Sequence, residues 1–442
     1  MAKKYDLIVV GGGTSGLEAA KTAAQNGLRV ALVEMKTSPA KIQRACAQMF
    51  LVNMDSFYNE RMYFSREQKK WVYPANNFSV TYSGGYREFY GCHFIAPDGE
   101  HRIEFGDYEK NSSGAGTAAV VFDKQVLLQG LYDEGKKAGV DYYLERTVTD
   151  VRKEAGGVAV HTHAGEKMFG TFCIAADGIN SLVARKLGMN KNRHFFTTAS
   201  GISFYVSGVS FDRSEMICMG NTYDHTGGLG GVHFSMLPSV YRDDEYWLYM
   251  HSQEKFDYFT KKSSFSHWFK NAELQHKRCC VISMWSSLRD PFKDNVLFVG
   301  DTVWFAEAEN NGALLSGHKA ANAVSQALHT GRPDGQGVRE YRQWWASNWY
   351  DTHDYRDFLC YPVFFRLFSE EDLNYLHKII DTKLFWSLNP FNLYNHMQKG
   401  LAPHLEQIKK EQPVLAQKIA GFSRDTAMRL MKPAARLGYP AY

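Results

Sequence analysis

The first forty residues alternate short apolar runs with a stretch of small residues. Leu7–Val10 and Val30–Val33 are apolar runs that predict two strands. Leu17–Asn26 is rich in Ala and predicts a helix that ends near Gly27. A strand, a helix and a second strand in this order predict a βαβ unit.

Strand-like patterns recur farther along the chain. Residues 140–178 predict a three-stranded meander with turns at 155–157 and 164–166. Residues 92–105 predict a hairpin whose turn holds Pro97, Asp98 and Gly99. Further strands of one sheet are expected at 201–209, 231–237, 246–252 and 279–285.

These elements predict an α/β chain (α+β overall) in three parts. A discontinuous Rossmann-type domain is expected from residues 1–75, 115–195 and 285–330. Residues 76–114 and 196–284 are expected to form a substrate domain built on an antiparallel sheet. A sheet of this kind over the first domain would close a pocket at the junction of the two.

From residue 331 the pattern predicts helices, so 331–442 is expected to be a helical C-terminal region. Its aromatic and basic residues suit packing on the protein's own body, a membrane surface or a dimer interface. From Pro403 onward there are seven Lys or Arg against three Asp or Glu, which is a weak signal for lipid. We therefore favour packing on the body of the protein.

Composition narrows the class of protein. The 442 residues are 44% hydrophobic and 22% charged with a net charge of +4, which does not suit a nucleic-acid-binding surface. No apolar run is long enough for a membrane span, and no secretory signal is expected, because the first residues lack a long apolar region and a small-residue cleavage site. Seven scattered Cys without a CxxC pair predict a cytoplasmic protein with free thiols, and no spacing predicts a metal site.

The residues between the first strand and helix, GGGTSG at 11–16, match G-x-G-x-x-G. The first glycine permits a tight turn, the second lets a pyrophosphate approach the backbone, and the third lets helix and strand pack closely. The helix N-terminus directs free N–H groups at phosphates. Glu34 can accept the hydroxyl groups of an adenosine ribose. We therefore predict a dinucleotide site that includes Gly11, Gly13, Thr14, Ser15, Gly16 and Glu34.

Two later segments extend this site. In 294–328 an apolar strand ends at Gly300-Asp301, and Gly312 is expected to open a helix of small residues that reaches Leu328. The segment 173–188 contains ADGINSLVAR, in which Asp177 follows a strand. With GGGTSG, these segments resemble the p-hydroxybenzoate hydroxylase-like flavoprotein superfamily over residues 1–330.

The resemblance implies that the dinucleotide is FAD. It implies that Asp301 contacts the ribityl chain, that Asp177 serves cofactor and domain packing, and that the backbone at Val148 meets adenine. Where the family has an Arg before a helix, this chain has Lys124, which lacks the bidentate geometry of Arg. The predicted cofactor set beyond the glycine motif is therefore Lys124, Val148, Asp177, Gly300, Asp301 and Gly312.

Within the superfamily, the chain most resembles the geranylgeranyl-reductase-like group. Those enzymes carry a Cys soon after the second strand, and Cys46 lies at that place, although Ala47 stands where a glycine is usual. In the loop after Asp301 the family's Pro is absent, and Glu307 and Glu309 appear. A desolvated carboxylate beside a flavin can exchange a proton. Glu307 is our first candidate acid, Glu309 the second, and Cys46 a further proton donor or gate.

Three functions remain open. The first is an FAD-dependent oxidoreductase that reduces or dehydrogenates a C=C bond of an apolar or aromatic small molecule by hydride transfer at flavin N5. The second is an FAD-dependent aromatic monooxygenase, and the third a non-catalytic electron carrier. The electron donor is expected to be NAD(P)H or a protein, and the chain to be a monomer or homodimer.

Overall fold

The computed structural model describes residues 3–52, 60–211, 216–225, 230–305, 309–385 and 390–435. One large sheet has a parallel centre in the order β11-β2-β1-β14, and β21 pairs in parallel with the other edge of β14. The strands are β1 (Lys3–Val10), β2 (Val30–Val33), β11 (Asp141–Tyr143), β12 (Val148–Glu154), β13 (Gly157–Thr162), β14 (Lys167–Ala175), β20 (Phe292–Lys293) and β21 (Val296–Phe298).

The predicted meander is confirmed, because β12, β13 and β14 pair antiparallel in sequence order. The segments in which the three central strands lie side by side, Leu7–Val10, Val30–Val33 and Phe172–Ala175, are apolar and buried, as parallel strands covered on both faces must be. The Rossmann-type α/β architecture expected from the sequence is therefore present.

Helix α1 (Thr14–Gln25) packs on this sheet, and α3 (Lys124–Lys137) and α6 (Glu309–His329) pack against α1. Small residues allow α1 and α6 to approach closely, since a Cβ on Gly317 would lie 2.3 Å from the Ser15 carbonyl oxygen. Helix α1 begins at Thr14 rather than at Leu17, inside the glycine motif. Its end is as expected, with Gly27 left-handed just beyond it.

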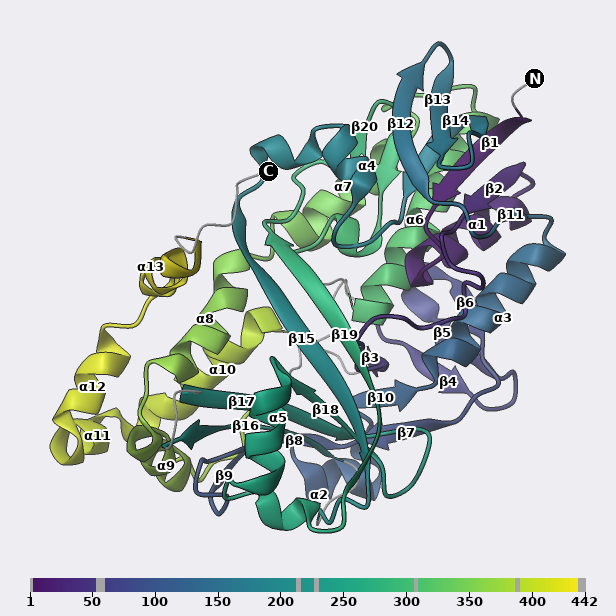
Figure 1. Cartoon of the computed structure of the whole chain (residues 1–442). Coiled ribbons are helices and arrows are strands. Elements are labelled where there is room, and N and C mark those ends of the chain that lie inside the picture. Colours follow the sequence, from purple (N-terminus) through teal and green to yellow (C-terminus); the bar gives the residue numbers. More distant parts are fainter. Residues whose placement is uncertain are drawn as a thin grey trace.

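The second large sheet has the order β19-β15-β18-β17-β16-β8-β9. Its two long strands, β15 and β19, cross the molecule from the first sheet to the opposite end (Figure 1). The hairpin β8–β9 and the further strands predicted for one sheet are confirmed. The bounds are β8 (Gly91–Ile95), β9 (Arg102–Phe105), β15 (Phe195–Ser207), β16 (Met216–Asp224), β17 (Gly230–Pro238), β18 (Tyr246–Met250) and β19 (Glu273–Trp285).

Two small antiparallel sheets, β3-β10-β7 and β4-β5-β6, complete the strand structure of the described residues. Short helices α2 and α4 and the longer α5 join the strands. Their bounds are β3 (Met49–Leu51), β4 (Tyr63–Ser65), β5 (Lys70–Tyr73), β6 (Phe78–Thr81), β7 (Tyr86–Phe89), β10 (Ala119–Phe122), α2 (Tyr108–Lys110), α4 (Leu182–Lys186) and α5 (Gln253–Lys261).

The C-terminal region is helical, as predicted, and its helices lie beside the second sheet (Figure 1). Leu384 joins this sheet, because its N–H donates to the Glu104 carbonyl at 2.8 Å and its carbonyl accepts from the Gly106 N–H at 2.7 Å. The helices are α7 (Arg339–Trp345), α8 (Tyr355–Arg366), α9 (Glu370–Ile379), α10 (Pro390–Leu401), α11 (Leu405–Glu411), α12 (Pro413–Ala420) and α13 (Arg424–Ala435).

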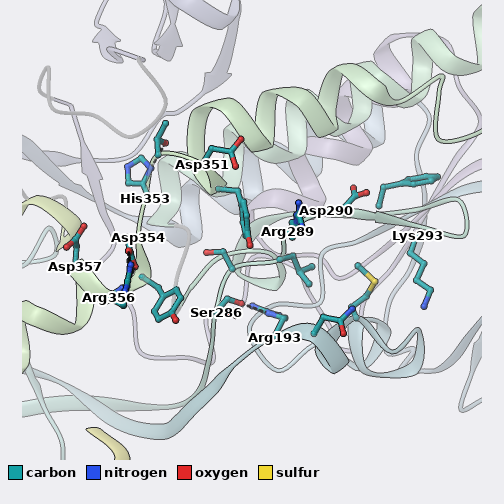
Figure 2. A pocket seen from close by; sticks show the side chains of 18 of the residues that line it. Arg193, Ser286, Arg289, Asp290, Lys293, Asp351, His353, Asp354, Arg356 and Asp357 are labelled. Atoms are coloured by element: carbon teal, nitrogen blue, oxygen red, sulfur yellow. Dashed lines mark hydrogen bonds and ion pairs between the residues drawn. The ribbon is translucent and has the colours of Figure 1, made fainter. Parts of the chain in front are cut away.

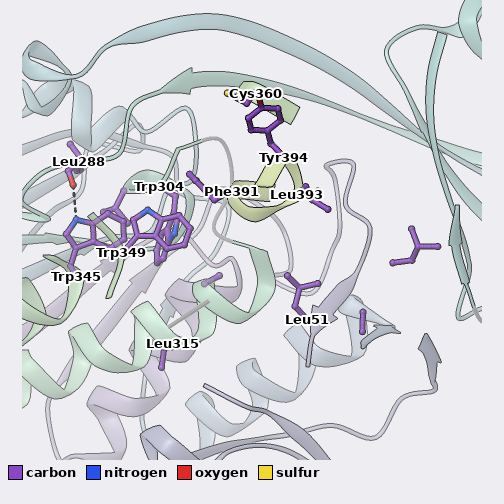
Figure 3. Packing of buried hydrophobic residues seen from close by; sticks show 14 of the residues in the cluster. Leu51, Leu288, Trp304, Leu315, Trp345, Trp349, Cys360, Phe391, Leu393 and Tyr394 are labelled. Carbon is purple, nitrogen blue, oxygen red and sulfur yellow. Dashed lines mark hydrogen bonds between the residues drawn. The ribbon is translucent and has the colours of Figure 1, made fainter. Parts of the chain in front are cut away.

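Aromatic packing ties this region to the rest of the chain. The Trp304 ring lies 4.7 Å from that of Trp345 and 5.4 Å from that of Trp349, centroid to centroid (Figure 3). The Trp345 indole N–H donates to the Leu288 carbonyl at 2.8 Å. The C-terminal tryptophans thus pack on the protein's own core, the alternative favoured from the sequence. Of the helices in the described ranges, none has both the length and the apolar sequence needed to cross a membrane.

Candidate functional site

A cavity of about 860 Å³ opens where β1, β2, β14 and β21 end. The carboxyl ends of parallel strands meet at this edge, which is where α/β sheets bind their ligands. Gly11 follows β1, Glu34 follows β2, Asp177 follows β14, and Asp301 follows β21. The predicted residues that line it are Gly11, Gly13, Thr14, Ser15, Glu34, Cys46, Lys124, Val148, Asp177, Asp301 and Glu309.

The three motif glycines differ in what surrounds them. A Cβ on Gly11 would lie 2.4 Å from the Ala176 carbonyl oxygen, and Gly11 has a φ of +104°. A Cβ on Gly16 would lie 1.9 Å from the Gly11 carbonyl oxygen. A Cβ on Gly13 would meet no atom of the described residues within 4 Å, apart from its own neighbours in the chain. The first and third glycines are therefore required by packing, whereas the second leaves the cavity wall open to a ligand.

Two polar groups beside this turn suit a dinucleotide. The Thr14 hydroxyl is buried and has no hydrogen-bond partner among the described residues, a costly arrangement that a phosphate oxygen would relieve. The Glu34 carboxylate accepts the Gly12 N–H at 2.5 Å and the Lys36 N–H at 2.8 Å. These bonds hold the carboxylate at the end of β2, and each oxygen keeps a lone pair for a ribose hydroxyl.

The two aspartates of the site have different partners. Asp177 accepts the Ser181 hydroxyl at 2.6 Å and the Val183 N–H at 3.1 Å, and so holds the start of α4. Burial raises the pKa of this carboxyl, and the hydrogen bonds oppose that rise only in part. Asp301 lies 3.6 Å from the Arg44 guanidinium. Asp177 is thus engaged in packing as well as lining the cavity.

At one end of the cavity, Cys46 lies among nitrogen donors. Its sulfur lies 3.3 Å from the Gln48 N–H nitrogen, 3.5 Å from Lys124 Nζ and 3.9 Å from Asn310 Nδ2. Lys124 is the first residue of α3, which Asp123 caps by accepting the Gln125 N–H at 2.9 Å. The fold therefore brings together a thiol and an ammonium that are 78 residues apart in sequence.

Gln48 connects Cys46 and Lys124 to the second sheet. Its amide nitrogen donates to the Tyr205 hydroxyl at 2.8 Å, and its amide oxygen accepts the Lys124 N–H at 3.0 Å and the Tyr241 hydroxyl at 3.1 Å. Arg278 on β19 donates to the same Tyr205 hydroxyl at 3.1 Å. Gln48 is 3% exposed and has a φ of +55°. Because a non-glycine residue seldom adopts this left-handed backbone conformation, we infer that the hydrogen bonds of its buried side chain hold Gln48 in place.

Sequence reasoning missed Gln48, Tyr205, Arg278 and Asn310. They come from four separate segments and match no motif, so a single sequence offers little signal for them. The nearest available clue is position, because Gln48 follows Cys46 by two residues.

The start of α6 corrects one prediction. The helix begins at Glu309, not at Gly312, because the first turn is fixed by bonds to β3. The Asn311 side chain accepts a hydrogen bond from the Leu51 N–H at 3.0 Å and donates one to the Leu51 carbonyl at 2.9 Å. The Asn310 side chain donates to the Met49 carbonyl at 3.1 Å. Gly312 is buried in that first turn and is absent from the cavity lining.

The remaining predicted residues take three different places. Glu309 lines the cavity with a φ of +56°. Gly300 packs against Ser15, since a Cβ there would lie 2.6 Å from the Ser15 hydroxyl. Glu307 lies outside the described residues.

Comparison with known proteins agrees with this geometry. A model of the FAD binding domain family matches residues 4–303. A digeranylgeranylglycerophospholipid reductase of Methanospirillum hungatei is 23% identical over 91% of this chain and 95% of its own length. A reductase of the same name from Methanococcoides burtonii is 28% identical over 50% of this chain and 49% of its own length.

Solved structures show the same fold at low identity. A geranylgeranyl bacteriochlorophyll reductase-like protein of Thermoplasma acidophilum aligns with a TM-score of 0.66 and 16% identity, over 94% of this chain and all of its own. A flavin-dependent brominase aligns with a TM-score of 0.56 and 15% identity, over 98% of each chain.

Proposed function

The chain belongs to the FAD binding domain family and is a geranylgeranyl-reductase-like, FAD-dependent oxidoreductase, and from this premise we propose that it reduces a C=C bond of an apolar, isoprenoid-type substrate. Relatives named as reductases of digeranylgeranylglycerophospholipid align over nearly the whole chain and support this choice. The single observation on which this proposal rests is the contact between the Cys46 thiol and Lys124 at the cavity wall.

The residues present fit FAD. We propose that the open turn at Gly13 and the unpaired Thr14 hydroxyl receive the pyrophosphate, that Glu34 receives the adenosine ribose, and that Asp301 receives the ribityl chain. Val148 lies at the cavity wall where adenine is expected. When bound and reduced, FAD supplies a hydride from its N5 position.

Reduction of a C=C bond also needs a proton for the second carbon, and the protein can supply it. We propose Cys46 as the donor. Lys124 Nζ, 3.5 Å from the sulfur, would stabilise the thiolate that remains after the thiol has given its proton. Glu309 lines the same cavity and is the second candidate, and Glu307 stays a prediction from the sequence.

A single-turnover experiment tests the reaction. The holoprotein is reduced without oxygen and mixed with a geranylgeranyl glycerolipid in detergent, while flavin absorbance is recorded and product mass measured. Reduction predicts flavin reoxidation together with a gain of two hydrogens per saturated bond. Reoxidation only after oxygen is admitted, with a transient flavin adduct and an added oxygen atom, would replace the proposal with the monooxygenase.

A pair of variants tests the proton donor. Cys46→Ala should lower the rate of product formation by about 100-fold or more, the usual contribution of a positioned acid. Glu309→Gln should change the rate of product formation by no more than a few-fold relative to the unmodified protein. The opposite order of effects would move the role from the thiol to the carboxyl group.

The electron donor and the oligomeric state also stay predictions. An FAD reductase needs a donor as well as its small-molecule substrate, and we propose NAD(P)H or a reduced carrier protein. The chain is proposed to act in the cytoplasm as a monomer or homodimer.

A further inference from the structure

A second cavity, of about 910 Å³, lies apart from the cofactor cavity and shares none of its lining residues. One wall comes from residues 188–193 and 286–293, and the other from residues 350–357 at the start of α8, with Arg424 of α13 (Figure 2). It is therefore formed between the segments that follow β14 and β19 and the C-terminal helices.

Most charges on the C-terminal wall are paired. Arg356 donates two hydrogen bonds to the Asp354 carboxylate. Arg424 donates two to the Asp357 carboxylate, at 2.6 and 2.7 Å. On the other wall, Asp290 pairs with Arg342, which lies outside the lining. Asp351 is the remaining lining carboxylate, and it is exposed and forms no ion pair with a described residue.

Cations on the opposite wall are not neutralised. Arg289 is exposed and has no hydrogen bond or ion pair with any described residue. Within the described ranges, Lys293 Nζ donates only to the Leu187 carbonyl, at 2.7 Å. Figure 2 shows Arg289 and Lys293 on the side of the cavity away from the Arg356–Asp354 pair. With Arg193, three cations therefore face one unpaired carboxylate.

Arg193 is the most constrained of these cations. Its guanidinium donates to the carbonyls of Ser286, Thr302 and Trp304, with no carboxylate among its partners in the described chain. Burial without a counter-charge lowers the pKa of Arg193 to about 9. A mostly buried guanidinium held by neutral acceptors leaves a positive potential in the cavity.

We propose that this second cavity binds a phosphate-bearing small molecule, with Arg289 and Lys293 contacting the phosphate and Arg193 supplying a fixed positive charge behind them. Guanidinium and ammonium groups form strong, charge-assisted hydrogen bonds with phosphate oxygens. Two sources share this chemistry, the diphosphate of a nucleotide electron donor and the phosphate ester of a glycerolipid headgroup. The volume suffices for a ligand of nucleotide size.

Equilibrium dialysis of the FAD-saturated holoprotein tests the site with two probes, pyrophosphate and glycerol 3-phosphate. FAD saturation keeps both probes out of the cofactor cavity. Tighter binding of pyrophosphate would identify the nucleotide source, and tighter binding of glycerol 3-phosphate the lipid source. The test measures binding alone, so its failure would leave the proposed reaction untouched.

Variants locate the binding. Arg289→Ala and Lys293→Ala should each weaken binding of the tighter-binding probe by about tenfold, the usual effect of losing one charge-assisted hydrogen bond. Arg332→Ala is the matched control, an exposed arginine outside the cavity, and should change binding less than twofold. Absence of binding at millimolar concentrations, or equal binding by all three variants, would overturn the proposal.

Discussion

At the scale of single residues, experiments can distinguish the role of Gly13 in cofactor binding from the role of Gly16 in packing. Gly13→Ala should leave the apoprotein's free energy of unfolding within about 0.5 kcal/mol, because its Cβ meets nothing. The same variant should bind FAD more weakly, because the methyl group points into the space left for the cofactor. Gly16→Ala should lower the free energy of unfolding by about 1–3 kcal/mol or more, because it overpacks helix against strand.

Urea unfolding of the apoproteins and FAD titration by flavin fluorescence measure the two effects. Gly85→Ala is the control, since a Cβ there makes an ordinary contact of 3.6 Å with Val240. If Gly13→Ala destabilised the apoprotein as much as Gly16→Ala, the open turn would be a packing feature and not a ligand site.

Gln48 offers a second prediction at this scale. Gln48→Ala and Gln48→Gly both remove the bonds to Tyr205, Tyr241 and Lys124. They differ in the backbone, because only Gly adopts a φ of +55° without cost. Gln48→Gly should therefore be more stable than Gln48→Ala by about 1 kcal/mol.

Chemical denaturation of the two variants decides this comparison. Both variants lose the same hydrogen bonds, so the difference between their free energies of unfolding reports the cost of the left-handed backbone conformation. Equal stability, or a more stable alanine variant, would show that the left-handed conformation does not persist once the side chain is removed.

At the scale of elements, strands and hairpins were predictable because their signals are local. The short, mostly apolar run at 92–96, the alternation at 102–105 and the turn at Pro97-Asp98-Gly99 are local signals for the β8–β9 hairpin. The start of α6 was not predictable, because Asn310 and Asn311 are poor helix formers whose place is set by bonds to β3. The same limit applies to Gln48, whose partners lie on other elements.

Helix α9 carries a titratable group with a calculable effect. His377 is buried, its Nδ1 lies 2.7 Å from the Leu373 carbonyl oxygen, and burial lowers its pKa to about 4. In the unfolded chain the pKa is near 6.5. Between these values the unfolded state binds the proton that the folded state excludes, so stability falls as pH falls from 6.5 towards 4.

The full effect is about 3 kcal/mol, because each pKa unit corresponds to about 1.4 kcal/mol. His377→Asn keeps a side-chain donor and should show a shallower loss of stability in this pH range. His329→Asn, at an exposed histidine, is the control and should follow the unmodified protein. Parallel curves for all three proteins, measured by denaturation at each pH, would contradict the assignment.

At the scale of the molecule, the cofactor cavity and the C-terminal helices are joined by the segment after β21. Asp301 lines the cofactor cavity, and the fully buried Trp304 three residues later packs on Trp345 and Trp349. Arg193 holds the same segment through the Thr302 and Trp304 carbonyls. Because one short segment contacts both regions, a ligand that fixes it stabilises the C-terminal helices as well.

FAD is therefore expected to slow amide exchange in α7, as well as in α1, where the cofactor itself lies. Exchange is compared by mass spectrometry between apoprotein and FAD-saturated protein. Trp304→Leu should preserve the protection of α1 and reduce that of α7, because it removes the ring contacts with Trp345 and Trp349 while leaving the glycine turn intact. If the variant kept full protection of α7, the coupling would run through another route, for which Arg193 is the next residue to replace.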